Sequence, residues 1–104
     1  PRNVIASDGF YEKKIKITWD IVEPEAVYEV YRSESLAGEK TMITSLGWLE
    51  SNTIHDVDST LITTKDYYYW VRAKFRFSGS PTSEFSQPDI GYLKRVASTR
   101  EERN

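Results

Sequence analysis

The stretch that decides the fold is residues 67–75, which reads YYYWVRAKF. It is rich in aromatic residues and contains neither glycine nor proline, which is typical of a long β-strand. Side chains alternate between the two faces of a strand, so the stretch presents two rows. One row is mostly apolar and is expected to face a core, whereas the other is aromatic and basic and is expected to face outward. The inward row is Tyr67, Tyr69, Val71, Ala73 and Phe75, and the outward row is Tyr68, Trp70, Arg72 and Lys74.

Working outward from this strand, six other short segments have the composition or the alternation of strands. They are residues 3–6, 13–20, 27–32, 41–46, 53–55 and 85–93. Within the second of these, Ile15, Ile17 and Trp19 alternate with polar residues, as in a half-buried strand. Turn signals separate the segments, such as Ser7-Asp8-Gly9 and the proline at position 24. Seven short strands without a convincing helix before residue 93 predict an all-β fold, a seven-stranded antiparallel β-sandwich.

The length and composition indicate one domain and exclude several classes of site. The chain has 104 residues, no cysteine, a single histidine and a formal net charge of −2. We expect one domain over residues 1–93, followed over 94–104 by a linker or a frayed tail. The lack of cysteine excludes disulfides, thiol catalysis and cysteine-zinc sites. The slightly acidic charge favours neither nucleic acid nor an anionic membrane surface, and the apolar runs are too short for membrane insertion. The Pro1-Arg2 start is typical of a domain cut from a longer protein.

Three motifs in this order resemble a fibronectin type III domain, of the kind found in bacterial secreted or surface proteins. They are Ile15-Lys16-Ile17-Thr18-Trp19, Tyr28-Glu29-Val30-Tyr31-Arg32 and Tyr67-Tyr68-Tyr69-Trp70-Val71-Arg72-Ala73. The resemblance runs from Val4 to Tyr92 and implies an immunoglobulin-like sandwich. It also implies that Tyr67 is a tyrosine corner, with its hydroxyl bonded to backbone near Leu61. The structural core that we expect consists of Trp19, Tyr28, Val30, Tyr67, Tyr69 and Val71.

An aromatic and charged stripe is the first candidate for binding. Tyr68, Trp70 and Arg72 point outward on one strand, and Tyr31 points outward on the strand expected beside it. Such a stripe would suit a neighbouring domain, a partner protein or a sugar, because tyrosine and tryptophan give large contact areas. The alternative is that these side chains pair with one another across the strands, Glu29 with Arg72 among them, and only stabilise the sheet.

Trp48 is the second candidate, because it follows Gly47 in a predicted connection where it has no obvious place in the core. Two hypotheses stay open for it. It anchors a partner or stacks on a sugar ring, or it folds back and covers the open end of the core.

Neither a metal site nor a catalytic site is predicted, and we expect no cofactor. Asp56 and Asp58 lack the spacing of a calcium loop and are expected in a turn at a strand end. His55 has no second histidine or cysteine to share a metal with, and it is expected at the surface. No residue set suggests a nucleophile or a general acid–base pair, so we expect no enzyme.

Taken together, these features predict a non-catalytic module of a larger protein that acts as a spacer and a protein–protein interaction domain. The alternative is a carbohydrate- or receptor-binding module that uses the exposed aromatic residues. The expected partners are adjacent domains of the same chain and, further, a protein or a polysaccharide. From the resemblance we expect a secreted or cell-surface location. The strands expected at the sheet edges are charged or interrupted by proline, which favours a monomer.

Overall fold

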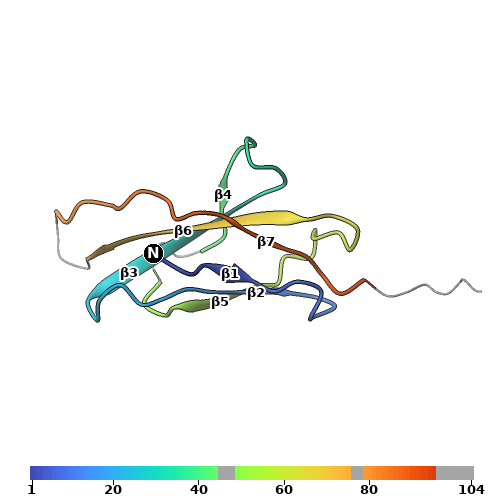
Figure 1. Ribbon diagram of the computed structural model, residues 1–104, viewed down its shortest axis with the longest axis horizontal. Coiled ribbons are helices and arrows are strands. Elements are labelled where there is room, and N and C mark those ends of the chain that lie inside the picture. Colours follow the sequence, from blue (N-terminus) through green and yellow to red (C-terminus); the bar gives the residue numbers. More distant parts are fainter. Residues whose placement is uncertain (45–48, 76–78, 96–104) are drawn as a thin grey trace, which may run out of the picture.

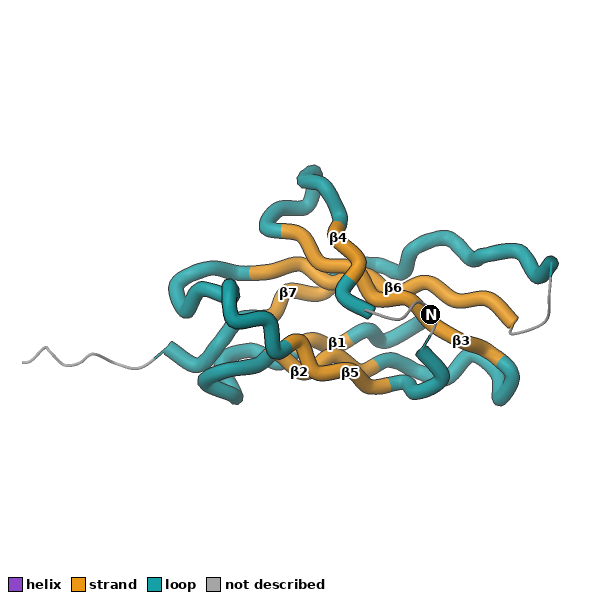
Figure 2. Tube along the Cα trace, turned by 180° about the vertical axis from the view of Figure 1, so that it is seen from behind, coloured by secondary structure: helices purple, strands orange, loops and turns teal. Residues whose placement is uncertain are grey.

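The protein is a sandwich of two antiparallel sheets, seen in a computed structural model that describes residues 1–44, 49–75 and 79–95. Figure 1 shows the two layers with the β3–β4 connection rising from one of them, and Figure 2 shows the same layers from behind. The smaller sheet has the order β1-β2-β5 and the larger the order β4-β3-β6-β7. The all-β sandwich predicted from the sequence is therefore confirmed. The strands are β1 (Ile5–Ala6), β2 (Ile15–Thr18), β3 (Ala26–Ser33), β4 (Thr41–Met42), β5 (Thr53–Asp56), β6 (Tyr67–Phe75) and β7 (Asp89–Gly91).

The pairing of β3 with β6 is the longest in the molecule. It runs in register from Ala26 opposite Phe75 to Ser33 opposite Tyr68. Alternation along both strands sends one row of side chains between the sheets. In that row Tyr28, Val30, Tyr69 and Val71 are fully buried, and Tyr67 extends it.

The smaller sheet closes the core from the other side. Ile15 and Ile17 on β2 are completely buried, and Trp19 follows them into the interior. The Trp19 ring meets the Tyr28 ring edge-on, with centroids 5.3 Å apart, so this contact joins the two sheets. No cysteine is available to join them, and aromatic packing takes that place.

The tyrosine corner implied by the resemblance is present. The backbone N–H of Ile62 donates a hydrogen bond of 2.7 Å to the Tyr67 hydroxyl. This bond fixes the connection between β5 and β6 against the start of β6, one residue beyond the expected Leu61.

The last strand, β7, is shorter than the predicted 85–93, because serine side chains take over part of its hydrogen bonding to β6. Residues 80–88 run beside β6 without forming a regular strand. Ser83 and Ser86 each form two hydrogen bonds with a single residue of β6. The N–H of Ser86 donates to the Val71 carbonyl while its hydroxyl accepts from the Val71 N–H, and Ser83 does the same with Ala73. The serine hydroxyls replace the backbone carbonyls of a neighbouring strand as acceptors. The N–H and C=O groups of Val71 and Ala73 therefore have hydrogen-bond partners although no regular strand lies beside them.

The other strand bounds differ by smaller amounts. The first strand begins at Ile5 because Asn3 has a positive φ of 56°, which no strand accommodates. The fourth was expected over 41–46 and spans Thr41–Met42, while residues 45 and 46 lie outside the described part. The predicted turn at Gly9 is found, with φ of 74°, and a Cβ there would lie 2.8 Å from the Tyr92 ring.

A buried ion pair also ties the two sheets together. Asp56 ends β5, and its Oδ2 accepts hydrogen bonds of 2.7 Å from Arg32 Nη1 and 2.7 Å from the Tyr69 hydroxyl. The Asp56 side chain is 3% exposed and that of Arg32 is 15% exposed. Asp58 receives a second bond from Arg32, 3.1 Å from Nη2. The turn expected at this strand end is present, because Asp56 Oδ1 accepts from the N–H of Asp58 at 3.4 Å. The sequence did not predict the second role of Asp56, whose other oxygen is the buried counter-charge of Arg32.

Replacing Asp56 should show how much the ion pair with Arg32 contributes to the free energy of unfolding. The Asp56→Ala variant removes the acceptor of the Tyr69 hydroxyl and leaves the mostly buried Arg32 with only the exposed carboxylate of Asp58. The free energy of unfolding should therefore fall by about 3 kcal/mol. Urea denaturation measures it. Asp66→Ala is the control, since its ion pair with Arg95 is exposed and should contribute no more than about 1 kcal/mol. Equal losses in the two variants would contradict the role assigned to Asp56.

Asp58 should make the free energy of unfolding depend on pH below about 4. Hydrogen bonds from the N–H and hydroxyl of Thr60, and then from Arg32, lower the pKa of Asp58 from 3.8 to about 2. A lowered pKa in the folded state stabilises the fold above the ordinary value, and this contribution is lost as the pH falls from 3.8 toward 2. The free energy of unfolding of Asp58→Asn should therefore fall less over this interval than that of the unchanged protein. Parallel pH profiles would contradict this assignment.

Candidate interaction surfaces

The outward row of β3 and β6 forms a bonded cluster at its centre. Glu29 and Arg72 are opposite each other in the register, and Arg72 Nε lies 2.8 Å from Glu29 Oε1. The Tyr31 hydroxyl donates to the same carboxylate at 2.9 Å and accepts from Arg72 Nη2 at 3.0 Å. Burial and the hydrogen bond to Glu29 raise the pKa of Tyr31. This part of the row is saturated by internal bonds.

Around this cluster, cations and aromatic rings alternate in a ladder. It consists of Tyr31, Trp70 and Arg72 from the row, together with Lys40 and Phe85 from outside it. Arg72 lies over the rings of Tyr31 and Phe85, at 5.2 and 5.1 Å from their centroids. Lys40 lies over Phe85 at 5.2 Å and over Trp70 at 4.4 Å. The Tyr31 and Phe85 rings meet edge-on at 5.0 Å. Each ring in the ladder therefore has a cation or an aromatic neighbour on it.

Four of the predicted binding residues come together here, but not as the open stripe that alternation suggested. Tyr31, Tyr68 and Arg72 are half-buried, and Trp70 is only 5% exposed. The expectation that Trp70 is exposed is wrong, because Lys40 lies on its ring and Tyr68 stacks beside it with centroids 6.4 Å apart. The fifth residue, Trp48, lies outside the described residues.

Sequence reasoning missed Lys40 and Phe85, the two residues that close this face. Lys40 precedes β4 in a connection without periodicity, so no pattern directs it to Trp70. Phe85 lies between Ser83 and Ser86, and the serine spacing of three was the available signal that this segment is not a regular strand. The interaction of Glu29 with Arg72 was expected as the structural alternative, and the structure contains it.

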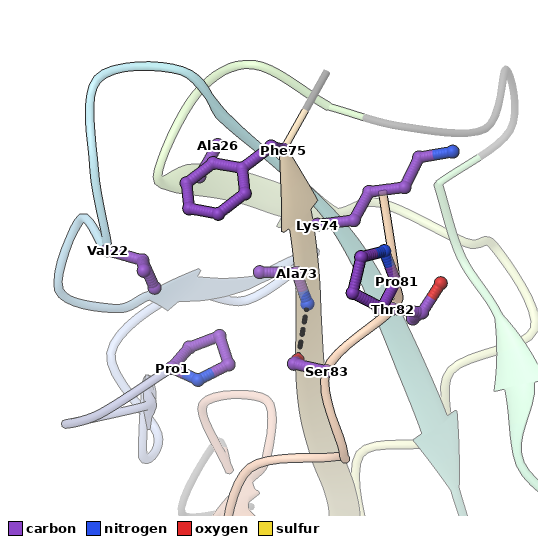
Figure 3. A pocket seen from close by; sticks show the side chains of 9 residues that line it. All are labelled: Pro1, Val22, Ala26, Ala73, Lys74, Phe75, Pro81, Thr82 and Ser83. Atoms are coloured by element: carbon purple, nitrogen blue, oxygen red, sulfur yellow. Dashed lines mark hydrogen bonds between the residues drawn. The ribbon is translucent and has the colours of Figure 1, made fainter. Parts of the chain in front are cut away.

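The second surface is an apolar pocket of about 340 Å³ at the end of the sandwich where Pro1 lies. Figure 3 shows Val22, Ala26, Phe75 and Pro1 around it, with the amine of Lys74 pointing away. The backbone N–H of Ala73 at its base is already bonded to the Ser83 hydroxyl. The pocket thus offers mainly apolar contact at the rim of the core. Its lining residues are Pro1, Val22, Ala26, Ala73, Lys74, Phe75, Pro81, Thr82 and Ser83.

The described residues contain no cluster that could hold a metal ion. Across residues 1–44, 49–75 and 79–95, no group of three or more histidine, cysteine, aspartate or glutamate side chains is placed to hold a metal. His55 is exposed, and Asp58 forms the expected turn by accepting from the N–H of Thr60 at 2.9 Å. In the same described part, no helix is long and apolar enough to cross a membrane.

Comparison with known proteins identifies the fold. No family model matches the sequence, and no curated protein matches it. Among solved structures, a fibronectin type III-like protein from Clostridium thermocellum has a TM-score of 0.71 at 22% identity, over 92% of this chain and 93% of that one. The chain therefore has the fibronectin type III fold, an immunoglobulin-like β-sandwich.

Two further similar structures are of chains longer than this one. The FN1–FN3 domains of chicken CNTN1 have a TM-score of 0.67 at 17% identity, over 89% of this chain and 33% of that chain. The chicken interferon gamma receptor alpha chain has a TM-score of 0.66 at 12% identity, over 90% of this chain and 44% of that chain. This chain thus spans about a third of the first and under half of the second.

Removal of Lys40 should open the ladder. The Lys40→Ala variant loses the cation on Trp70, so the free energy of unfolding should fall by about 1 kcal/mol and the Trp70 indole N–H should exchange faster with solvent. Denaturation and NMR hydrogen exchange measure these changes. Lys13→Ala, an exposed lysine with no ring beneath it, is the control and should change stability by less than about 0.5 kcal/mol. An unchanged Trp70 exchange rate would contradict the ladder.

Proposed function

We propose that this chain is a non-catalytic module of a larger protein, where it acts as a spacer and a protein–protein interaction domain. The observation that carries the proposal is the apolar pocket at the end of the sandwich, because Pro1 itself contributes to its lining. A segment or domain placed before Pro1 would meet this pocket first. Burial of apolar side chains there would fix the angle between the two units.

The positions of the two ends of the described chain support a spacer. Pro1 lies near Val22, which follows β2, whereas the N–H of Lys94 donates to the carbonyl of Tyr11, which precedes β2. Pro1 thus lies toward one end of the sandwich, and the chain after β7 runs toward the other (Figure 1). Modules built in this way set a distance when they are joined in series. The partial coverage of the CNTN1 and receptor structures supports a modular context.

The carbohydrate alternative receives less support from the described residues. A sugar ring stacks on an open aromatic face, and the Trp70 face is occupied by Lys40. Tyr31 and Arg72 are bonded to Glu29. A polysaccharide that shifts the NMR signals of Tyr68 and Trp70 would nevertheless favour this alternative over the spacer.

We also propose a secreted or cell-surface location in a bacterium. Its support is the similarity of fold to the Clostridium thermocellum protein and to the chicken receptor chain. Fractionation of the source cells with an antibody against this module tests it.

Substitution at the rim of the pocket tests the proposed interface. The module should be studied in the larger protein, joined to the unit that precedes it. There the amides of Ala26, Phe75 and Thr82 should shift relative to the isolated module, and the two units should tumble together in NMR relaxation. Val22→Asp places a charge at the pocket and should abolish both effects.

The matched control is Val57→Asp, at the opposite pole. Val22 is 48% exposed and Val57 is 66% exposed, so neither variant should unfold the module. Val57→Asp should leave the shifts and the joint tumbling unchanged. Absence of any shift in the joined protein, or equal effects of the two variants, would overturn the proposed interface.

A further inference from the structure

Two lysines and a histidine form a row on the outer face of the three-stranded sheet, away from the ladder and the pocket. Ile15 and Ile17 of β2 point into the core, so Lys14, Lys16 and Thr18 point outward. On the neighbouring strand His55 is directly opposite Lys16, and His55 is exposed.

This row carries positive charge with no counter-charge beside it. In the part of the chain that the structure describes, no ion pair involves Lys13, Lys14 or Lys16, while Arg32, Lys65, Arg72 and Arg95 each have a carboxylate partner. Lys14 lies over the Tyr11 ring, with its Nζ 4.5 Å from the ring centroid, so an aromatic face and not a carboxylate accompanies this charge.

The pKa of His55 reflects the positive charge of the two lysines. Its pKa is lowered, first by partial burial and then by the positive charges of Lys14 and Lys16. No acidic group contributes to that shift. The positive potential of the two lysines therefore reaches the imidazole and favours its neutral form, although the whole chain has a net charge of −2.

We propose that this row, Lys14, Lys16 and His55, binds a linear acidic polysaccharide. Lys14 and Lys16 are two residues apart in the chain, which corresponds to a spacing of about 7 Å along an extended strand. His55 is the residue paired with Lys16 on the neighbouring strand. A ligand that repeats its carboxylate or sulfate groups along a chain can meet such a row at several points. Thr18 and Thr53, paired in the next row of the register, add hydroxyls that can bond to sugar hydroxyls.

An acidic peptide fits the same charges less well. Peptides gain most of their affinity from apolar anchors in pockets or from backbone pairing at a sheet edge. The row consists of polar side chains on a sheet face and supplies neither. The proposal goes beyond the interdomain role, because it involves the other sheet and does not use the pocket at Pro1.

The test is binding of the isolated, folded module to four polymers by isothermal titration calorimetry. They are heparin (sulfated), polygalacturonate (carboxylated), dextran (neutral) and polyglutamate (an acidic peptide). At about 50 mM NaCl, where screening is weak, one or both acidic polysaccharides should bind, and added salt should weaken the binding. Dextran should not bind.

Two double variants locate the site. Lys14→Glu with Lys16→Glu should weaken binding at least about tenfold. Lys65→Glu with Lys74→Glu makes the same change in net charge on other elements and should change affinity by less than about twofold. Circular dichroism establishes that both variants fold. In the unchanged protein the amides of residues 14–18 and 53–55 should shift on binding, which tests the site even if a variant unfolds.

Three results would overturn the proposal. The first is no binding of either acidic polysaccharide at low salt. The second is an equal loss of binding in both double variants, which would indicate only a response to net charge. The third is tighter binding of polyglutamate than of the polysaccharides, which would assign the row to an acidic peptide.

Discussion

The pairing of β3 with β6 is the constraint on which the rest of the structure depends. One register decides two surfaces at once, because each strand sends alternate side chains to opposite faces. The inward row holds Tyr28 and Tyr69 in the core, and the outward row places Glu29 against Arg72 and Tyr31 beside Trp70. A slip by one residue would exchange the two rows, burying the charges and exposing the core. Both rows thus specify the same register.

The remaining elements attach to this pair by polar bonds as well as by packing. On one edge of β6, Ser83 and Ser86 satisfy the backbone of Ala73 and Val71. Toward the other sheet, Asp56 accepts from Arg32 on β3 and from Tyr69 on β6, so one carboxylate binds both strands of the pair. The molecule has no disulfide, and these bonds together with the contact of Trp19 and Tyr28 connect its layers. Because they are directional, they define one arrangement of the sheets where apolar packing alone would tolerate several.

The sequence allowed the fold to be predicted far better than the surfaces. The bounds of β6 and the inward positions of β2 and β3 follow from alternation, which is a local property. The burial of Trp70 does not, because it depends on Lys40, which lies over both the Trp70 and the Phe85 rings and comes from a segment without periodicity. The burial of Asp56 likewise depends on Arg32, 24 residues away in the chain. The shortening of the last strand had a visible cause in the spacing of Ser80, Ser83 and Ser86, but that spacing has meaning only beside a strand whose N–H groups need acceptors.

Native-state hydrogen exchange by NMR tests the central claim most directly, namely that the β3–β6 pair is the most stable part of the molecule and that serine hydroxyls close its edge. The account predicts that the slowest amides lie in β3 and β6, and that those of Val71 and Ala73 belong to this group although no regular strand pairs with them on that side. If the slowest amides lie instead in β2 and β5, or if Val71 and Ala73 exchange as fast as the loops do, the account is wrong.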